Sequence, residues 1–401
     1  MVPPWSLLLG IAAYALRGLS LAPAPPSTLP AHERPLKLAA GVACVFSLGA
    51  ILLTIAQSPM GGWDAWAIWN LKARFLYFGL ADGSWSQLFR VEIGTHPDYP
   101  LLLPATIARY WLSLGEASQW APGLIGFACV LLCVMFLIGA GRTRADSSIV
   151  YAGVLVFLSS TAVTQQAGIQ FADLPLALYF LAAVVMLDAL WTRQVHGSVV
   201  IKEAILLGLL LGLATEIKNE GILISLLVFG VFSVRQLATG QYGYLVRTST
   251  VAVIFWCVAH LPHRLFMFQH PVTNDLVASA SAGAFLDMLT PERLVRLFEA
   301  VLPHLLDFIA APLVLFAAFL LLFRPKHLHN TAWWLLVIPL LLYAGYLAVL
   351  FFTPHDLNWH VDTTWQRLML HGWPALMYSV MVLVGGADTT RKRLPVHEVG
   401  D

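Results

Sequence analysis

Ionisable and aromatic residues of this 401-residue chain gather in five short motifs, each beside a long apolar run. The motifs occupy residues 61–75, 94–104, 171–175, 216–221 and 353–367. Carboxylates and imidazoles in such segments can accept and donate protons, and a lysine or arginine beside them can hold an anion such as phosphate. The chemistry of the protein is therefore expected in these segments, and the apolar runs must bring them together.

The first motif, residues 61–75, carries a carboxylate within a stripe of tryptophans. Trp63, Trp66 and Trp69 recur every three residues, as they would along one face of an interfacial helix, and this explains the tryptophans without any function. It does not explain Asp64, which on a helix would share a face with Lys72 two turns later. Because a carboxylate at a membrane border is costly unless it is paired or used, Asp64 is predicted to be functional.

The second motif, residues 94–104, contains Pro97, Pro100 and Pro104, which oppose a regular helix. His96 and Asp98 are therefore expected on a rigid extended turn. A solvated turn closed by the aspartate side chain is one explanation of this pair. A catalytic or metal-binding role stands beside it as an equal alternative.

The third motif, residues 171–175, places a single carboxylate, Asp173, at the start of an apolar run. An aspartate that caps a helix, followed by Pro175 in the first turn, is a sufficient structural reason. A functional role is favoured, because the other motif acids are expected in the same leaflet.

The fourth motif, residues 216–221, is the tip of a hairpin between two apolar runs. Capping and snorkelling would account for its polar residues. The hairpin is too short to reach far into water, however, so Lys218 and Glu220 are expected to pair with each other or to face a polar cavity. Lys218 is well placed there to hold a phosphate.

The fifth motif, residues 353–367, joins the last two apolar runs. Asp356 and His360 are four residues apart and would face one side of a helix, with His355 before them and Arg367 at the end. An ordinary loop seldom combines histidines, aspartates, tryptophans and an arginine. These residue types bind sugar hydroxyls, stack on rings and hold phosphate oxygens.

The composition shows what must position these motifs. Hydrophobic residues make up 59% of the chain and charged residues 11%, whereas soluble proteins carry roughly 25% charged residues. The mean hydropathy is +0.75. A soluble globular protein is excluded, and the chain is predicted to be a polytopic membrane protein.

Net charge and cysteine content exclude two further classes. A formal charge of +1 gives no basic field, so no nucleic-acid partner is expected. All four cysteines lie inside apolar runs, where a thiol behaves as a small hydrophobic group. Neither a disulfide framework nor a cysteine metal site is therefore expected.

Ten apolar runs are long enough to cross a bilayer of about 30 Å as helices. They lie near residues 36–57, 119–141, 149–166, 172–191, 201–217, 221–237, 247–266, 305–323, 332–352 and 366–386. An eleventh run, residues 5–22, contains Arg17 and is either a further span or a signal peptide, but Ala22-Pro23-Ala24 is a poor cleavage site. The predicted fold is all-α, with about 10–11 transmembrane helices and extracytoplasmic juxtamembrane helices. Three parts are expected: a weak apolar segment and linker (1–35), a transmembrane domain (36–386) and a tail (387–401).

The distribution of charge predicts the orientation. If residues 58–118 face outward, the inner side holds 13 of the 23 basic and 7 of the 22 acidic residues. The inner side then carries +6 and the outer side −5, as the positive-inside rule requires. The tail is expected in the cytoplasm, and chemistry is expected on the outer face, which has two long connections, residues 58–118 and 267–304.

The five motifs, in this order and on this topology, resemble the GT-C superfamily of polyprenyl-phosphate-sugar-dependent glycosyltransferases. The resemblance covers about residues 36–386 and is strongest to bacterial members akin to protein O-mannosyltransferases, aminoarabinose transferase and lipopolysaccharide-core galacturonosyltransferases. It implies a GT-C-like fold in the bacterial inner membrane and a polyprenyl-phosphate sugar donor. It also implies a lipid, glycan or protein acceptor, an active site on the extracytoplasmic side, and inversion of the anomeric centre.

The resemblance also implies roles for residues. Asp64 would take the proton of the acceptor hydroxyl, although many members carry two adjacent acids where Asp64 is flanked by Trp63 and Ala65. Cations would stabilise the charge on the phosphate: Lys218, Arg367 and either Arg264 or Lys72. The remaining substrate-binding candidates are His96, Asp98, Asp173, Glu220, His355, Asp356 and His360.

No organic cofactor is expected, and a divalent metal is possible through Asp64, His96, Asp98 or Glu220. The main alternative function is a polytopic transporter or flippase of lipid-linked or small polar substrates. Transporters place their ionisable residues near the middle of the membrane, whereas nearly all the acids here gather at one interface. This distribution favours the enzyme.

Overall fold

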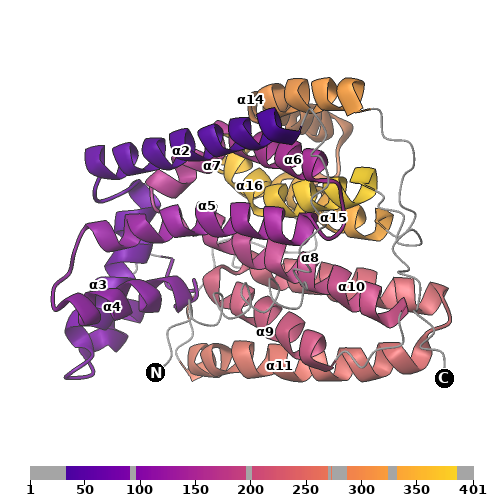
Figure 1. Cartoon of the computed structure of the whole chain (residues 1–401). Coiled ribbons are helices and arrows are strands. Elements are labelled where there is room, and N and C mark those ends of the chain that lie inside the picture. The colour runs from indigo at the N-terminus through magenta and orange to yellow at the C-terminus, as the bar shows by residue number, and fades with distance from the viewer. Residues whose placement is uncertain are drawn as a thin grey trace, which may run out of the picture.

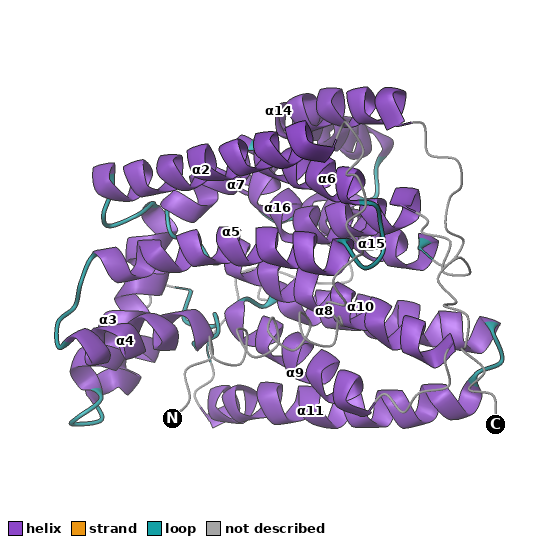
Figure 2. Cartoon of the chain, viewed as in Figure 1, coloured by secondary structure: helices purple, strands orange, loops and turns teal. Residues whose placement is uncertain are grey.

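The computed structural model describes residues 33–90, 96–195, 201–269, 272, 287–323 and 332–385. The expected span at 5–22 and the tail at 387–401 lie outside these residues. Within the described residues the secondary structure is helical and contains no strand, which confirms the all-α class (Figure 2).

Eight helices are long and apolar enough to cross a membrane. They are α2 (Glu33–Gln57), α5 (Trp120–Gly141), α8 (Asp173–Val195), α10 (Glu220–Ala238), α11 (Tyr242–Gln269), α14 (Pro291–Phe323), α15 (Trp333–Phe351) and α16 (Leu357–Gly385). Most of them lie side by side, with the shorter α3 (Asn70–Gly79) and α4 (Leu102–Leu114) at one end (Figure 1). We call this the α3–α4 end of the bundle. A multi-pass membrane protein is the architecture that these helices support.

Two of the ten expected spans differ from a single helix of full spanning length. The run near 149–166 forms α6 (Ser147–Ser159) and α7 (Thr161–Gly168), which meet at a bend of 59° and together could make a ninth span. The run at 201–217 forms α9 (Ile201–Ile217), whose 17 residues rise about 25 Å, somewhat less than the hydrocarbon core. Short apolar elements of this kind look like full spans in a sequence because hydropathy does not record a bend or a tilt.

The central helix is α8. It is apolar from Leu174 to Leu187, and such a helix must be buried all round. In its membrane-spanning part 94% of the residues are buried, against 11% in α11 and 17% in α14. It packs on α16, α9 and α5, so residues at its first turn are held by the most enclosed part of the molecule.

Helices α9 and α11 approach each other closely through glycines. A Cβ atom on Gly208 would lie 2.1 Å from the carbonyl oxygen of Ala252, and one on Gly212 would lie 2.6 Å from the Cβ of Ala259. The two glycines are four residues apart, the small-residue spacing that lets membrane helices meet at the backbone. This contact fixes the position of the hairpin that follows α9.

The first long connection contains juxtamembrane helices, as expected, whereas two other connections are shorter than expected. The segment 58–118 contains a π-helical turn (η1, Ala65–Trp69), α3, a 3₁₀ segment (η2, Ser84–Arg90) and α4. The expected second long connection, 267–304, is wrong in its second half, because α14 already begins at Pro291. The fifth motif is likewise no loop from Leu357 onward, since α16 begins there. In both places a polar helical turn extends an apolar helix, and a search for apolar runs cuts it off.

Candidate functional site

Asp173 is the centre of a cluster of charged residues at the start of α8. Its side chain is fully buried. Its Oδ1 lies 2.9 Å from Lys218 Nζ and 2.7 Å from His371 Nε2, and its Oδ2 lies 3.1 Å from Arg367 Nε. A buried carboxylate is stable in the folded protein only when charges and donors surround it in this way. Three elements, α8, the α9–α10 hairpin and α16, therefore converge on one residue.

Arg367 connects this buried carboxylate with a second, more accessible one. Its Nη2 lies 2.7 Å from Asp64 Oδ2, and the guanidinium also lies over the ring of Phe171, 4.6 Å from the centroid. The side chains of Asp64 and Arg367 are 18% and 17% exposed, whereas that of Asp173 is not exposed. The network thus has a sealed interior, around Asp173, and a partly exposed rim, which includes Asp64 and Arg367.

Two glycines allow Asp64 to reach this position. Gly61 has a φ of +73°, and a Cβ atom there would lie 2.6 Å from the carbonyl oxygen of Ile169. The amide of Gly62 donates to the same carbonyl at 2.9 Å. Because no side chain separates the two backbones, the segment before Asp64 packs directly on the turn before α8.

Lys218 forms a second ion pair, with Glu220 Oε1 at 2.8 Å. Burial lowers the pKa of Lys218, but Asp173 and Glu220 outweigh burial and hold the pKa above its ordinary value. The side chain is only 4% exposed. The expected pairing of Lys218 with Glu220 is therefore present, and its ammonium is enclosed between two carboxylates. Arg367 is the cation of this cluster that reaches the rim.

Asn219, between these two residues in sequence, ties the hairpin to two other elements. Its Nδ2 donates to Asp98 Oδ2 at 2.9 Å, and its Oδ1 accepts from Arg264 Nη2 at 3.0 Å. Among the described residues, the Nε of Arg264 is buried without a hydrogen-bond partner. Asp98 and Arg264, two of the residues expected at the site, are thus joined to it through the side-chain amide of Asn219. Asn219 lies in the fourth motif but was not among the expected site residues.

Lys72 binds the turn that begins at His96 and is not part of the charged cluster around Asp64 and Asp173. It is 1% exposed, and its Nζ donates to the carbonyl oxygens of His96 at 2.6 Å and Tyr99 at 2.9 Å. His96 has a φ of +41°, so the clamped turn is left-handed at its first residue. Burial lowers the pKa of Lys72 to about 7, although Asp98 opposes this shift.

This lowered pKa predicts how stability changes with pH. Between about pH 7 and pH 10 the unfolded chain binds one more proton at Lys72 than the folded chain, so stability rises with pH, by up to about 1.4 kcal/mol per pH unit. Lys72→Met removes this contribution. We expect the difference in Tm between the wild type and Lys72→Met to shift in favour of the wild type as pH rises from 7 to 10. A difference that does not change with pH would contradict the lowered pKa.

The tryptophans of the first motif do not form one stripe. Trp63 and Trp66 are about half exposed and meet edge to face at 5.7 Å, but Trp69 is fully buried and stacks on Tyr99 at 5.4 Å. The π-helical turn Ala65–Trp69 causes the difference, because its wider turn breaks the three-residue period of the stripe. Lys72 is thereby directed away from Asp64.

Of the fifth motif, only Arg367 joins the charged cluster. Asp356 Oδ1 caps α16 by accepting from the amide of Trp359 at 2.9 Å, and His360 Nδ1 lies 2.7 Å from Thr353 Oγ1. The rings of His355 and His360 meet edge to face at 5.6 Å. Among the described contacts none of these three expected site residues bonds to the cluster. Their contacts stabilise the first turn of α16, about two turns before Arg367.

Two site residues lie outside every motif. His371 donates from Nε2 to the Asp173 carboxylate, and its Nδ1 lies 2.8 Å from the hydroxyl of Tyr346 on α15, so a neutral His371 accepts a hydrogen bond from that hydroxyl. Both side chains are almost completely buried. A signal for His371 exists in the sequence, because it follows Arg367 by four residues on one helix face. Tyr346 has no such signal.

The residues proposed for a metal do not meet. Among the described residues no group of three or more His, Cys, Asp or Glu side chains could hold a metal ion. Asp64 pairs with Arg367, Glu220 pairs with Lys218, and Asp98 bonds to Asn219. Each carboxylate thus has a partner of its own.

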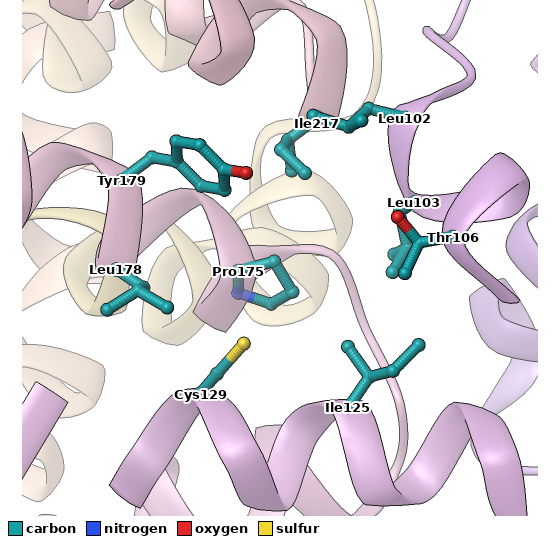
Figure 3. A pocket seen from close by; sticks show the side chains of 9 residues that line it. All are labelled: Leu102, Leu103, Thr106, Ile125, Cys129, Pro175, Leu178, Tyr179 and Ile217. Atoms are coloured by element: carbon teal, nitrogen blue, oxygen red, sulfur yellow. The ribbon is translucent and has the colours of Figure 1, made fainter. Parts of the chain in front are cut away.

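One apolar cavity lies next to the charged cluster, and a second cavity adjoins the first. The smaller, about 10 Å³, lies between α4, α5, α8 and α9, and the hydroxyl of Tyr179 and the sulfur of Cys129 point toward it (Figure 3). Its wall includes Pro175, two residues after Asp173, and Ile217, directly before Lys218. The larger, about 320 Å³, lies along α4 and α5 and shares Ile125 with the smaller one. The two cavities thus adjoin at Ile125, and the smaller one lies next to residues that neighbour the charged cluster in sequence.

Comparisons of the chain with protein-family models, curated proteins and solved structures yield no match.

Proposed function

We propose that this protein is a membrane glycosyltransferase that moves a sugar from a polyprenyl phosphate to an acceptor hydroxyl on the extracytoplasmic face. The convergence of five charged side chains at the α3–α4 end of an apolar bundle carries the proposal: Asp64, Asp173, Lys218, Glu220 and Arg367. Charged groups inside a membrane protein are costly and mark functional sites by default. Here three of them also reach the rim, Asp64, Glu220 and Arg367.

The resemblance to the GT-C superfamily supports the same function. Each of the five motifs that carry it contributes a residue to one continuous set of contacts, from Asp64 through Arg367 and Asp173 to the hairpin, and from the hairpin to Asp98. Motifs that are unrelated in function have no reason to meet at one place.

The proposed reaction is a single displacement. The acceptor oxygen forms a bond to the anomeric carbon, the bond from that carbon to the phosphate oxygen breaks, and the electron pair stays on the phosphate. Asp64 takes the proton of the acceptor hydroxyl and later releases it to water. Arg367 stabilises the charge that develops on the phosphate, while its Nε bond to Asp173 keeps the guanidinium in place.

The apolar cavity along α4 and α5 is the proposed site of the donor's prenyl chain. Its wall is formed by Tyr110, Leu114, Ser118, Trp120, Ala121, Leu124, Ile125 and Ala128. It shares Ile125 with the smaller cavity, whose wall includes Pro175 and Ile217, so a prenyl chain that continued from one cavity into the other would bring its phosphate toward Arg367. Apolar pockets with a few polar groups at one end are typical of lipid sites.

Filling this cavity should weaken donor binding. We expect Ala128→Trp, which places an indole in the cavity, to weaken binding of a polyprenyl phosphate by about tenfold or more, since burial of a few methylene groups at about 0.8 kcal/mol each is lost. Leu131→Trp on the same helix is the matched control, because Leu131 is 37% exposed and does not line the cavity. Equal affinity of both variants would place the prenyl chain elsewhere.

The function itself is tested with the full-length protein in proteoliposomes. A panel of polyprenyl phosphates carrying labelled hexoses or pentoses is supplied together with an acceptor extract from the cell envelope. We expect label to move from one donor to an acceptor, with release of the free polyprenyl phosphate. Movement of an intact donor across the bilayer without cleavage would identify a flippase and overturn the proposal.

A further inference from the structure

The turn before α4 carries Tyr99, whose phenol makes no hydrogen bond among the described residues. The amide of Tyr99 donates to the carbonyl of His96 at 3.0 Å, and Lys72 donates to the carbonyl of Tyr99 at 2.9 Å. Its ring stacks on Trp69 at 5.4 Å and on His96 at 4.9 Å, with interplanar angles of 13° and 17°. Backbone and ring are therefore held in one position, as a preorganised group requires.

The charged surroundings of the Tyr99 phenol come from three elements. Glu220 and Lys218 of the hairpin, Arg367 of α16 and Asp98 of the same turn all act on its hydroxyl. Burial and Glu220 raise the pKa of Tyr99, so the phenol keeps its proton at any physiological pH. It is a neutral donor in a place where the other donors are cations.

The phenol oxygen has no hydrogen-bond partner among the described residues, and the side chain is only partly buried. A buried hydroxyl normally finds a partner within the protein. A fixed, partly accessible hydroxyl in the turn whose Asp98 bonds to Asn219 of the hairpin is therefore available to a ligand beside the charged cluster.

Building on the proposed function, we infer that Tyr99 donates a hydrogen bond to the phosphate of the lipid donor and strengthens it as negative charge develops there. The ammonium of Lys218 is enclosed by Asp173 and Glu220, and Arg367 shares its guanidinium between Asp173 and Asp64. A phosphate arriving at the rim thus meets cations that are already engaged. A neutral donor with no carboxylate partner adds stabilisation without competing for them.

The test compares the affinities of two probes for each variant in nanodiscs: a long-chain polyprenyl phosphate and the matching uncharged polyprenol. We expect the wild type to bind the phosphate much more tightly than the alcohol. Tyr99→Phe keeps the ring stack and should weaken phosphate binding about tenfold, the loss expected for one hydrogen bond to a charged group, while alcohol binding stays constant. Tyr77→Phe on α3, whose ring packs edge-on against Trp111 at 5.8 Å, is the control.

The outcomes separate the inference from the proposed function. If the wild type does not distinguish phosphate from alcohol, the proposed function fails, and the role of Tyr99 fails with it. If the wild type distinguishes them and Tyr99→Phe does so equally well, the role of Tyr99 is refuted and the function stands. The ratio of the two affinities is measured within each variant, so a partial loss of folded protein does not affect it.

Discussion

Replacing Asp173 by asparagine should destabilise the folded protein by about 3–5 kcal/mol, because it leaves Lys218 and Arg367 buried without their shared counter-charge. The amide can still accept a hydrogen bond, but it cannot balance a buried ammonium. The expected result is a clear fall in Tm in detergent. Transfer activity should fall with it, since Arg367 loses the contact that holds its guanidinium beside Asp64.

A matched control for this change is Asp362→Asn. Asp362 also forms an ion pair, with His304 at 2.8 Å, but its side chain is 63% exposed. An exposed pair contributes about 0–1 kcal/mol, so the Tm of Asp362→Asn should stay close to that of the wild type. If the two variants lose the same stability, Asp173 does not hold a buried ion network.

The second large effect concerns catalysis. In the transfer assay, Asp64→Asn should lower the turnover about 10²- to 10⁴-fold, because an amide cannot take the proton of the acceptor hydroxyl. Asp64 is partly exposed and contacts only one cation, so the fold should persist. Binding of the polyprenyl phosphate should change much less than turnover, which separates a base from a group that only binds the donor.

The control for Asp64→Asn lies in the same segment of the chain. The side chain of Asp82 is exposed, and its Oδ1 accepts a hydrogen bond from the amide of Ser84 at 2.9 Å. This bond holds the pKa of the Asp82 carboxyl below its ordinary value. Asp82→Asn should leave turnover unchanged. Turnover of Asp64→Asn within a few-fold of the wild type would remove Asp64 as the base, and Glu220, the other carboxylate at the rim, would be the next residue to test.

The helices were largely predictable from local sequence. The apolar run at 36–57 became α2 from Glu33 to Gln57, and the run at 119–141 became α5 from Trp120 to Gly141. Local information failed where the helix type or its length depended on polar residues. The π-helical turn before Asn70 and the polar first turns of α14 and α16 have no periodic pattern of apolar residues from which a helix could be predicted.

The site residues were predictable as types but not as partners. The motif acids and cations stood out because a charge within an apolar chain needs a reason. The pair of Lys218 and Glu220, two residues apart, was predictable. The long-range pairs were not, since Asp64 and Arg367 are 303 residues apart and Asp173 and His371 are 198 apart. Lys72 illustrates this limit. Its position in the sequence suggests a cation beside Asp64, but in the structure its ammonium donates to two carbonyl oxygens of the turn before α4.

The sequence by itself determined that this chain forms apolar helices for a bilayer and that its few charges lie in short motifs between them. These properties depend on hydropathy and on the cost of a charge in hydrocarbon, which act residue by residue. Only the tertiary structure decided that Asp173 is sealed inside, that Lys218 is enclosed by two carboxylates, and that Arg367 and Asp64 form the accessible rim. Burial and pairing depend on which helices pack together, and that packing arises from contacts between segments far apart in the chain.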